Sequence, residues 1–144
     1  EDYLKITDRK KDIIVNAGGD NISPTRIEAK IDIEPEIAQS MLYGDYKNYL
    51  VAVIVPDKDF ALNWAKENGK DQKLESIVKD DDFNKLMKEV VNRVNKNLSV
   101  IEQVRKFILI DHEFTIENSM MTVSMKVRRF AVKDKYQEDL EKLY

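Results

Sequence analysis

The sequence feature that most constrains the fold is the apolar run YLVAVIV at residues 49–55. Its β-branched residues follow one another without polar residues between them, a pattern typical of a strand that is covered on both faces. Residues 37–43 form a second apolar segment, and the turn-like sequence GDYKN separates the two. We therefore expect these segments to pair as antiparallel strands.

Two helices are indicated by their end signals. Ser23 suits an N-cap and Pro24 the first helical position, and Pro35 ends this helix because proline disfavours helical geometry in the residue before it. A second helix, capped by Asp59, should end at Gly69, since glycine favours helix termination.

Residues 83–98 carry the clearest helical pattern, because apolar residues recur there at the spacing of one face of an amphipathic helix. The sequence KFILI at residues 106–110 predicts a third core strand. A closing helix is expected near the end of the chain. Its apolar residues are spaced by four, four and three positions: Val132, Tyr136, Leu140 and Leu143.

The first residues suggest a short two-stranded hairpin over residues 3–15, with the charged stretch 8–11 as its turn. The sequence NAGGDN at residues 16–21 predicts a loop, since two consecutive glycines permit backbone angles closed to other residues. Strands and helices without regular alternation predict an α+β fold. We expect a small mixed sheet of about three strands packed with helices.

Composition narrows the range of functions. The 144 residues carry a net charge of −3, which argues against a nucleic-acid surface, because phosphate binding needs a basic excess over a whole face. Cysteine is absent, so disulfides, zinc–thiolate sites and thiol catalysis are excluded. Without Tyr49, whose side chain carries a hydroxyl, the longest apolar run is the six residues 50–55, well below the roughly 20 of a membrane helix, and residues 1–15 show no secretory leader. We expect a cytoplasmic chain, excised from a longer protein.

Residues 111–126 form a long loop with weak periodicity. Loops of this length in compact domains are more often functional or mobile than incidental. Three of the five methionines lie in it and should pack loosely or lie exposed. The loop ends at Lys126, and Arg128 and Arg129 follow at once. The residues alone leave two interpretations open: these cations either lie on a solvated surface, or one of them reaches into a functional site.

Three smaller features also have a structural and a functional interpretation. Gly18 and Gly19 lie in no dinucleotide or phosphate-loop motif, so they form either a tight turn or a place where a narrow ligand passes close to the backbone. His112 has no Ser or Cys partner pattern around it, which favours a solvated or core role over catalysis. The three carboxylates at residues 80–82 favour helix capping over metal binding.

Residues 3–28, YLKITDRKKDIIVNAGGDNISPTRIE, resemble the motif that opens the C-terminal domain of AMP-forming acyl-CoA synthetases, in the adenylate-forming superfamily. Residues 43–57, YGDYKNYLVAVIVPD, are similar to the strand pair that follows in those enzymes, and residues 105–144 resemble the tail of the long-chain fatty acyl-CoA synthetase branch. The resemblance covers essentially the whole chain. It implies a mobile C-terminal domain that closes over a large N-terminal domain in two orientations, one for each half-reaction.

The resemblance also implies roles for single residues. Lys126 falls on the catalytic lysine, which serves the formation of acyl-AMP from a fatty acid and ATP. Arg9 matches the arginine that contacts the nucleotide ribose, and Lys11 matches the hinge about which the domain turns. Gly18 and Gly19 match the loop that meets the pantetheine arm of CoA.

By the same resemblance, residues 1–12 would be the linker and hinge, 13–110 the helix and sheet core, 111–126 the catalytic-lysine loop and 127–144 the C-terminal helix. ATP with Mg²⁺ and CoA would be substrates of the full enzyme, and a fatty acid and the chain's own N-terminal domain its partners. We expect no metal site, no nucleic-acid binding and no transmembrane segment in this piece, while peripheral membrane contact stays open. The ATP-binding loop and the acyl tunnel belong to the N-terminal domain, so the fragment alone should be inactive.

One departure from the family pattern lies in the loop. Where the family usually has G-E-L-T-P-T, residues 119–124 read SMMTVS, and the loss of proline and glutamate frees the backbone and removes one charge. Arg128 and Arg129 should be structural. Two alternatives to a fatty acid–CoA ligase stay open: a stand-alone docking module of the same fold, or a parent enzyme that adenylates another carboxylic acid or loads a carrier protein.

Overall fold

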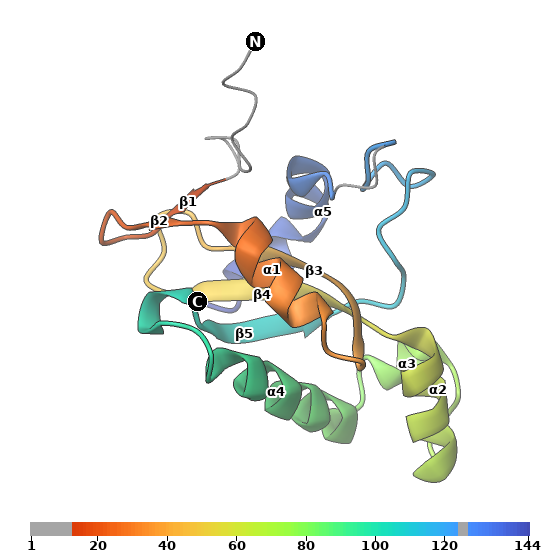
Figure 1. Ribbon diagram of the computed structural model, residues 1–144. Coiled ribbons are helices and arrows are strands. Elements are labelled where there is room, and N and C mark those ends of the chain that lie inside the picture. The colour runs from red at the N-terminus through yellow and green to blue at the C-terminus, as the bar shows by residue number, and fades with distance from the viewer. Residues whose placement is uncertain (1–12, 124–126) are drawn as a thin grey trace.

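The computed structural model describes residues 13–123 and 127–144, and in these the predicted α+β fold is confirmed (Figure 1). A three-stranded sheet in the order β3-β4-β5 lies between helices, and a separate two-stranded sheet, β1-β2, precedes it. Strand β3 spans Ile37–Tyr43, β4 spans Leu50–Pro56 and β5 spans Val104–Leu109. The sheet is mixed, as expected, because β4 pairs antiparallel with β3 and parallel with β5.

The central strand β4 is buried along its whole length, as its apolar run predicts. Alternate residues of the sheet face two separate cores. On one face Leu42, Ala52 and Ile54 pack with α1, α2 and α4. On the other face Met41, Val53 and Val55 pack with α5, which runs behind the sheet in Figure 1. The strand predicted at 106–110 is an edge strand, and Arg105 and Lys106 on it are exposed.

The hairpin that the structure describes joins β1, Ile14–Val15, to β2, Asn21–Ile22. The hairpin predicted over residues 3–15 has its first strand and its turn outside the described residues. The loop predicted at 16–21 is one residue too long, because Asn21 pairs with Val15. The turn can close this early because Gly19 adopts a φ of 85° and the Asn16 side-chain oxygen accepts a hydrogen bond from the Asp20 amide at 2.9 Å.

Helix α1, Pro24–Asp32, follows Ser23 as predicted, and helix α5, Arg129–Glu141, buries the three apolar residues Val132, Tyr136 and Leu140. Helix α2, Lys58–Glu67, begins earlier than expected. Its N-cap is Asp57, whose carboxylate accepts a hydrogen bond from the Phe60 amide at 2.9 Å, so the assignment of the cap to Asp59 was wrong. The reason is that β4 runs to Pro56, so the chain turns directly into the helix.

Two short helical segments were not predicted, because single turns carry too few residues for a periodic pattern. They are α3, Leu74–Ile77, and the 3₁₀ helix η3, Val100–Glu102. None of the helices in residues 13–123 and 127–144 combines the length and the apolar composition that crossing a bilayer requires.

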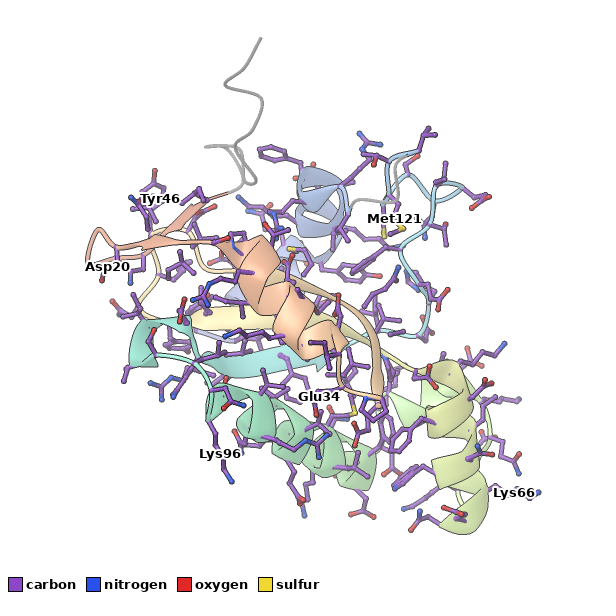
Figure 2. The ribbon with its side chains drawn as sticks, in the orientation of Figure 1. Asp20, Glu34, Tyr46, Lys66, Lys96 and Met121 are labelled. Atoms are coloured by element: carbon purple, nitrogen blue, oxygen red, sulfur yellow. The ribbon has the colours of Figure 1, made fainter. Side chains whose placement is uncertain are left out.

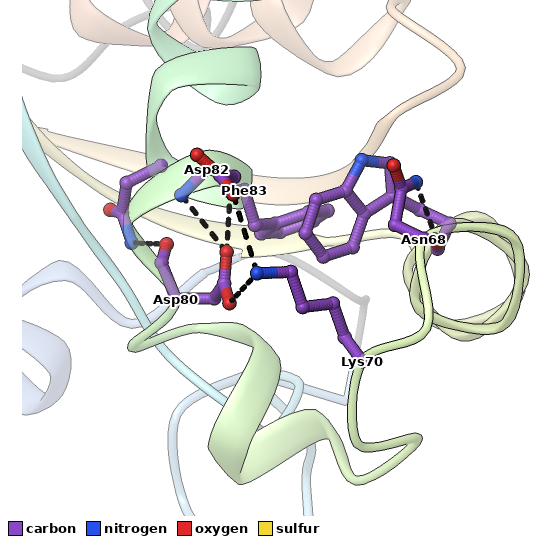
Figure 3. Close-up of polar contacts among 7 residues, drawn as sticks. Asn68, Lys70, Asp80, Asp82 and Phe83 are labelled. Atoms are coloured by element: carbon purple, nitrogen blue, oxygen red, sulfur yellow. Dashed lines mark hydrogen bonds and ion pairs between the residues drawn. The ribbon is translucent and has the colours of Figure 1, made fainter.

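Helix α4, Asp81–Asn95, begins at a capped N-terminus (Figure 3). One carboxylate oxygen of Asp80 accepts hydrogen bonds from the amides of Asp82 at 2.9 Å and Phe83 at 3.1 Å. The other oxygen lies 3.3 Å from the Lys70 ammonium. Asp80 therefore caps the helix, as predicted, and the Phe83 amide and the Lys70 ammonium hold its pKa below the usual range.

The replacement Asp80→Ala should lower the melting temperature, because two amides at the start of α4 lose their acceptor and Lys70 loses an ionic partner. Differential scanning calorimetry would measure the shift. Asp81→Ala is the matched control. This replacement also removes one negative charge near the start of α4, but Asp81 is not the N-cap. Equal shifts for the two variants would contradict the capping role.

Candidate functional site

The structure describes the surroundings of the predicted site residues more fully than the residues themselves. Lys126, Arg9 and Lys11 lie outside the described residues, whereas Gly18 and Gly19 lie within them. The loop that leads to Lys126 is described up to residue 123, and the chain is described again from Val127. The lysine loop, residues 111–126, is anchored on both described sides of this gap.

The lysine loop is attached to the sheet by buried side chains. Phe114 is 1% exposed and Met120 is 4% exposed, and both belong to the core on the α5 face. The expectation of loosely packed or exposed methionines is wrong for Met120. The Gln39 side chain on β3 fixes the loop further, because it accepts a hydrogen bond from the Phe114 amide at 2.6 Å and donates one to the Phe114 carbonyl at 3.1 Å.

A compact turn around Asn118 gives the loop its shape. The Asn118 side-chain oxygen accepts hydrogen bonds from the amides of Thr115 at 3.0 Å and Met120 at 3.1 Å. Its side-chain nitrogen donates to the Glu113 carbonyl at 2.9 Å. Ser119 follows with a φ of 66°, a left-handed conformation that reverses the chain. Residues 113–121 are thus held by their own hydrogen bonds, without a helix or strand.

The two described sides of the Lys126 segment lie next to each other. Met121 and Val127 form an isolated antiparallel bridge. The Arg128 amide donates to the Met120 carbonyl at 2.7 Å, and the Arg128 guanidinium donates to the Ser119 carbonyl at 3.0 Å. Val127 and Arg128, which follow Lys126 in the sequence, are therefore fixed against the turn around Asn118.

A partly buried ion pair holds the start of α5, three residues after Lys126. The Arg129 guanidinium makes two hydrogen bonds to the Glu28 carboxylate on α1, at 2.6 and 3.0 Å. Glu28 is 6% exposed, and it also accepts a hydrogen bond from the Leu42 amide on β3 at 2.7 Å. The Arg129 guanidinium lies 3.5 Å from the Leu42 carbonyl. Both arginines contact the domain itself, in agreement with the structural role predicted for them.

The glycine loop, residues 16–20, lies beside the turn between β3 and β4. The Ala17 amide donates to the Lys47 carbonyl at 2.9 Å, and the Tyr46 amide donates to the Val15 carbonyl at 2.7 Å. Position 19 requires glycine, because its φ of 85° is unfavourable for residues with a side chain. Gly18 does not, because a Cβ there would make only ordinary contacts, 3.5 Å from Asn16 and 3.6 Å from Asp20. The fold alone does not account for the missing side chain at Gly18.

His112 bridges two residues near the start of the lysine loop. Its Nδ1 lies 2.9 Å from the Asp111 carboxylate and its Nε2 lies 2.7 Å from the Tyr136 hydroxyl. These residues line an open cavity of about 420 Å³ beside Lys79 and Lys135. Contact with His112 lowers the pKa of Asp111, and burial raises the pKa of Tyr136 to about 12. His112 is thus partly exposed and hydrogen bonded within the domain, and the solvated or core role expected for it stays a prediction.

Sequence reasoning missed the residues that hold the loops. Gln39 contacts Phe114 across 75 positions of sequence, and Glu28 contacts Arg129 across 101. Neither Gln39 nor Glu28 belongs to a local pattern that indicates such a contact. The only available signal was polarity at positions that the periodicity of the strand or helix directs toward the interior.

Residues 11–144 match the family model of the AMP-binding enzyme C-terminal domain. The chain is 33% identical over 144 residues to the long-chain-fatty-acid–CoA ligase FadD15 of Mycobacterium tuberculosis. It is 31% identical over 144 residues to the human long-chain-fatty-acid–CoA ligase 1. These alignments cover 99% and 98% of this chain but 24% and 21% of the relatives. The chain thus spans about a quarter or less of the length of these curated relatives.

Solved structures show the same similarity. The adenylation domain of a carboxylate reductase from Mycobacterium chelonae superposes with a TM-score of 0.80 at 28% identity, over 95% of this chain and 20% of that one. The A-PCP didomain of the carboxylic acid reductase from Segniliparus rugosus, in complex with AMP, superposes with a TM-score of 0.72 at 27% identity, over 96% of this chain and 18% of that one.

The replacement Arg129→Met should lower the free energy of unfolding by about 3–5 kcal/mol, because it leaves the Glu28 carboxylate buried without its cation. Urea denaturation would measure the loss. Adding Glu28→Gln should recover part of it, since the neutral amide oxygen can still accept the hydrogen bond from the Leu42 amide. A double variant as unstable as the sum of the two single variants would show that the pair does not act as a unit.

The two glycines of the loop should respond differently to alanine. Gly19→Ala should lower the free energy of unfolding by about 1 kcal/mol, because a φ of 85° is unfavourable for any residue with a Cβ. Gly18→Ala should change it by less than about 0.5 kcal/mol, because its Cβ would make only ordinary van der Waals contacts with Asn16 and Asp20. Urea denaturation of both variants compares them directly, and a large loss for Gly18→Ala would show that the fold does require this glycine.

Proposed function

This chain belongs to the AMP-binding enzyme C-terminal domains, and from that membership we propose that it is the mobile C-terminal domain of an AMP-forming ligase that joins a long-chain fatty acid to CoA. The observation that carries the proposal is the match to two long-chain-fatty-acid–CoA ligases over nearly the whole of this chain. The anchored loop that leads to Lys126 supports it, because Phe114 and Met120 attach this loop to the sheet and the Met121–Val127 bridge joins its two described sides.

The proposed reaction has two steps. In the first, a carboxylate oxygen of the fatty acid attacks the α-phosphorus of ATP, and pyrophosphate leaves, so that acyl-AMP forms. In the second, the sulfur of CoA attacks the acyl carbonyl, AMP leaves with the bonding electrons, and the thiol proton is lost. We propose that Mg²⁺ accompanies ATP and that the pocket for both substrates lies mainly in an N-terminal domain beyond these residues.

Lys126 is proposed to act in the first step. Negative charge gathers on the oxygens around phosphorus as the carboxylate attacks, and a cation placed there stabilises the transition state. A lysine suits a group that arrives and departs, because its charge is compact and its stem is flexible. The contacts of Val127, Arg128 and Arg129 would fix the base of this stem. Arg9 would contact the ribose and Lys11 would be the hinge.

The glycine loop is proposed to act in the second step, where the thin pantetheine arm would pass Gly18 and Gly19. The open space around Gly19, where a Cβ would meet no atom within 4 Å, supports this role. Figure 2 supports two orientations, because Asp20 of the glycine loop and Met121 of the lysine loop lie at well-separated sides of the domain. We propose that the domain rotates between the two steps, so that each loop in turn faces the reaction centre.

The structural neighbours favour a second candidate for the acceptor of the acyl group, the thiol of a carrier protein in place of CoA. Both are adenylation domains of carboxylate reductases, and one is solved together with its PCP domain. The parent of this chain would then adenylate a carboxylic acid and transfer the acyl group to the thiol of a carrier protein. Comparing CoA with a thiol-loaded carrier protein as acceptors separates the two functions. A parent without adenylating activity would favour a docking module of the same fold.

The replacement Lys126→Ala in the full-length protein should slow acyl-AMP formation on the order of 10²–10³-fold, because one cation is lost from the transition state. Thioester formation from supplied acyl-AMP should change far less. Pyrophosphate release from ATP and palmitate measures the first step, and thioester formation from palmitoyl-AMP and CoA measures the second. Lys88→Ala, at an exposed position of α4, is the control. Equal losses in both steps would contradict the assignment of Lys126 to the first step.

A further inference from the structure

We propose that the C-terminal end of α5 positions the glycine loop, acting through the turn between β3 and β4, and so supports transfer of the acyl group to the thiol acceptor. This inference rests on the proposed function. It concerns a group of residues that we name the C-terminal clamp: Tyr43, Lys47, Tyr49, Glu141 and Tyr144. Figure 1 shows the C-terminus on the same side of the domain as the β1-β2 hairpin.

Tyr144 joins the two strand ends that flank the turn. Its hydroxyl donates to the Tyr49 carbonyl at 2.9 Å and lies 3.3 Å from the Tyr43 carbonyl. Its ring stacks on the ring of Tyr49, with centroids 4.8 Å apart, and the Tyr49 hydroxyl donates in return to the Leu143 carbonyl at 2.7 Å. The end of β3 and the start of β4 are thus held to the same tyrosine.

Glu141 holds the turn itself. Its carboxylate lies 2.7 Å from the Lys47 ammonium and accepts a hydrogen bond from the Tyr43 hydroxyl. The Lys47 ammonium also lies 4.9 Å from the centroid of the Tyr144 ring, so it contacts both a carboxylate and an aromatic face. Lys47 and then Tyr43 lower the pKa of Glu141, which keeps the carboxylate charged at neutral pH.

Lys47 connects the clamp to the glycine loop. Its side chain is held by Glu141 and Tyr144, while its carbonyl accepts the hydrogen bond of the Ala17 amide. The β1-β2 hairpin has strands of two residues each, and a hairpin this short is not stable by itself. Ile14 and Ile22 anchor its strands in the core, whereas the loop between them is held by hydrogen bonds to the neighbouring turn. Release of the Lys47 side chain would loosen the carbonyl that holds Ala17, next to Gly18.

The two ends of α5 thus hold different loops. Arg129 at the first end is fixed to Glu28 near the lysine loop, and Glu141 near the second end is fixed to the turn beside the glycine loop. Val132 and Tyr136 remain buried between them and keep the helix on the sheet. Damage to the clamp should therefore free the glycine loop without displacing the lysine loop.

The test is Tyr144→Phe and Lys47→Met in the full-length protein. Tyr144→Phe keeps the ring and removes the hydroxyl contacts, and Lys47→Met removes the cation. We expect kcat/KM for the thiol acceptor in the second step to fall about tenfold, which corresponds to the loss of one to two hydrogen bonds. Acyl-AMP formation should change by less than about twofold, and Lys47→Arg should restore the second step because it keeps the cation.

Hydrogen–deuterium exchange gives a readout that does not depend on activity. In Tyr144→Phe and Lys47→Met, amides of residues 15–20 and 44–49 should exchange faster, while those of residues 113–121 should not change. The control is Arg93→Met, which breaks surface contacts to Glu34 and Glu36 on the opposite face of the sheet. It should alter neither step and neither exchange pattern.

Several results would overturn the inference. Equal losses in both steps would show a general structural effect, and an unchanged second step would show that the clamp does not position the glycine loop. If the wild-type protein transfers no acyl group to any thiol, the proposed function fails. The exchange rates then decide the positioning role by themselves: faster exchange at residues 15–20 supports it, and unchanged exchange overturns it.

Discussion

The partly buried ion pair between Glu28 and Arg129 is the interaction that links the sheet to the helices on both of its faces. It joins α1, β3 and the start of α5, and it occupies the open edge of β3 at Leu42, where the backbone amide and carbonyl have no neighbouring strand. Burying two charges is costly unless both are paired and hydrogen bonded, and here both are. The pair thus couples the edge of the sheet to the chain that follows Lys126.

The two faces of the sheet contact different parts of the chain. The face toward α1, α2 and α4 is an apolar core with the regular spacing of helices and strands. The face toward α5 carries the same apolar spacing but also receives the lysine loop through Phe114 and Met120. The lysine loop therefore attaches to the face toward α5, whereas the strands that flank the glycine loop attach to the other face through Ile14 and Ile22.

Two errors of the sequence predictions share one cause. The cap of α2 is Asp57 and not Asp59, because the length of β4 decides where the helix begins. Met120 is buried because a turn built on Asn118 directs it to the sheet. In both cases local composition allowed several positions, and a contact with another element selected one. The helices and strands with long periodic patterns were predicted with nearly correct ends, because burial of one face constrains many residues at once.

The sequence by itself determined the α+β class, the pairing of β3 with β4, the amphipathic helices and, through its motifs, the family. These follow from patterns among neighbouring residues. Only the tertiary structure decided that Gln39 holds Phe114, that Glu28 pairs with Arg129 and that Lys47 links α5 to the glycine loop. Each of these contacts joins residues that lie far apart in the chain, and their distance depends on how the helices and strands pack, which no local pattern encodes.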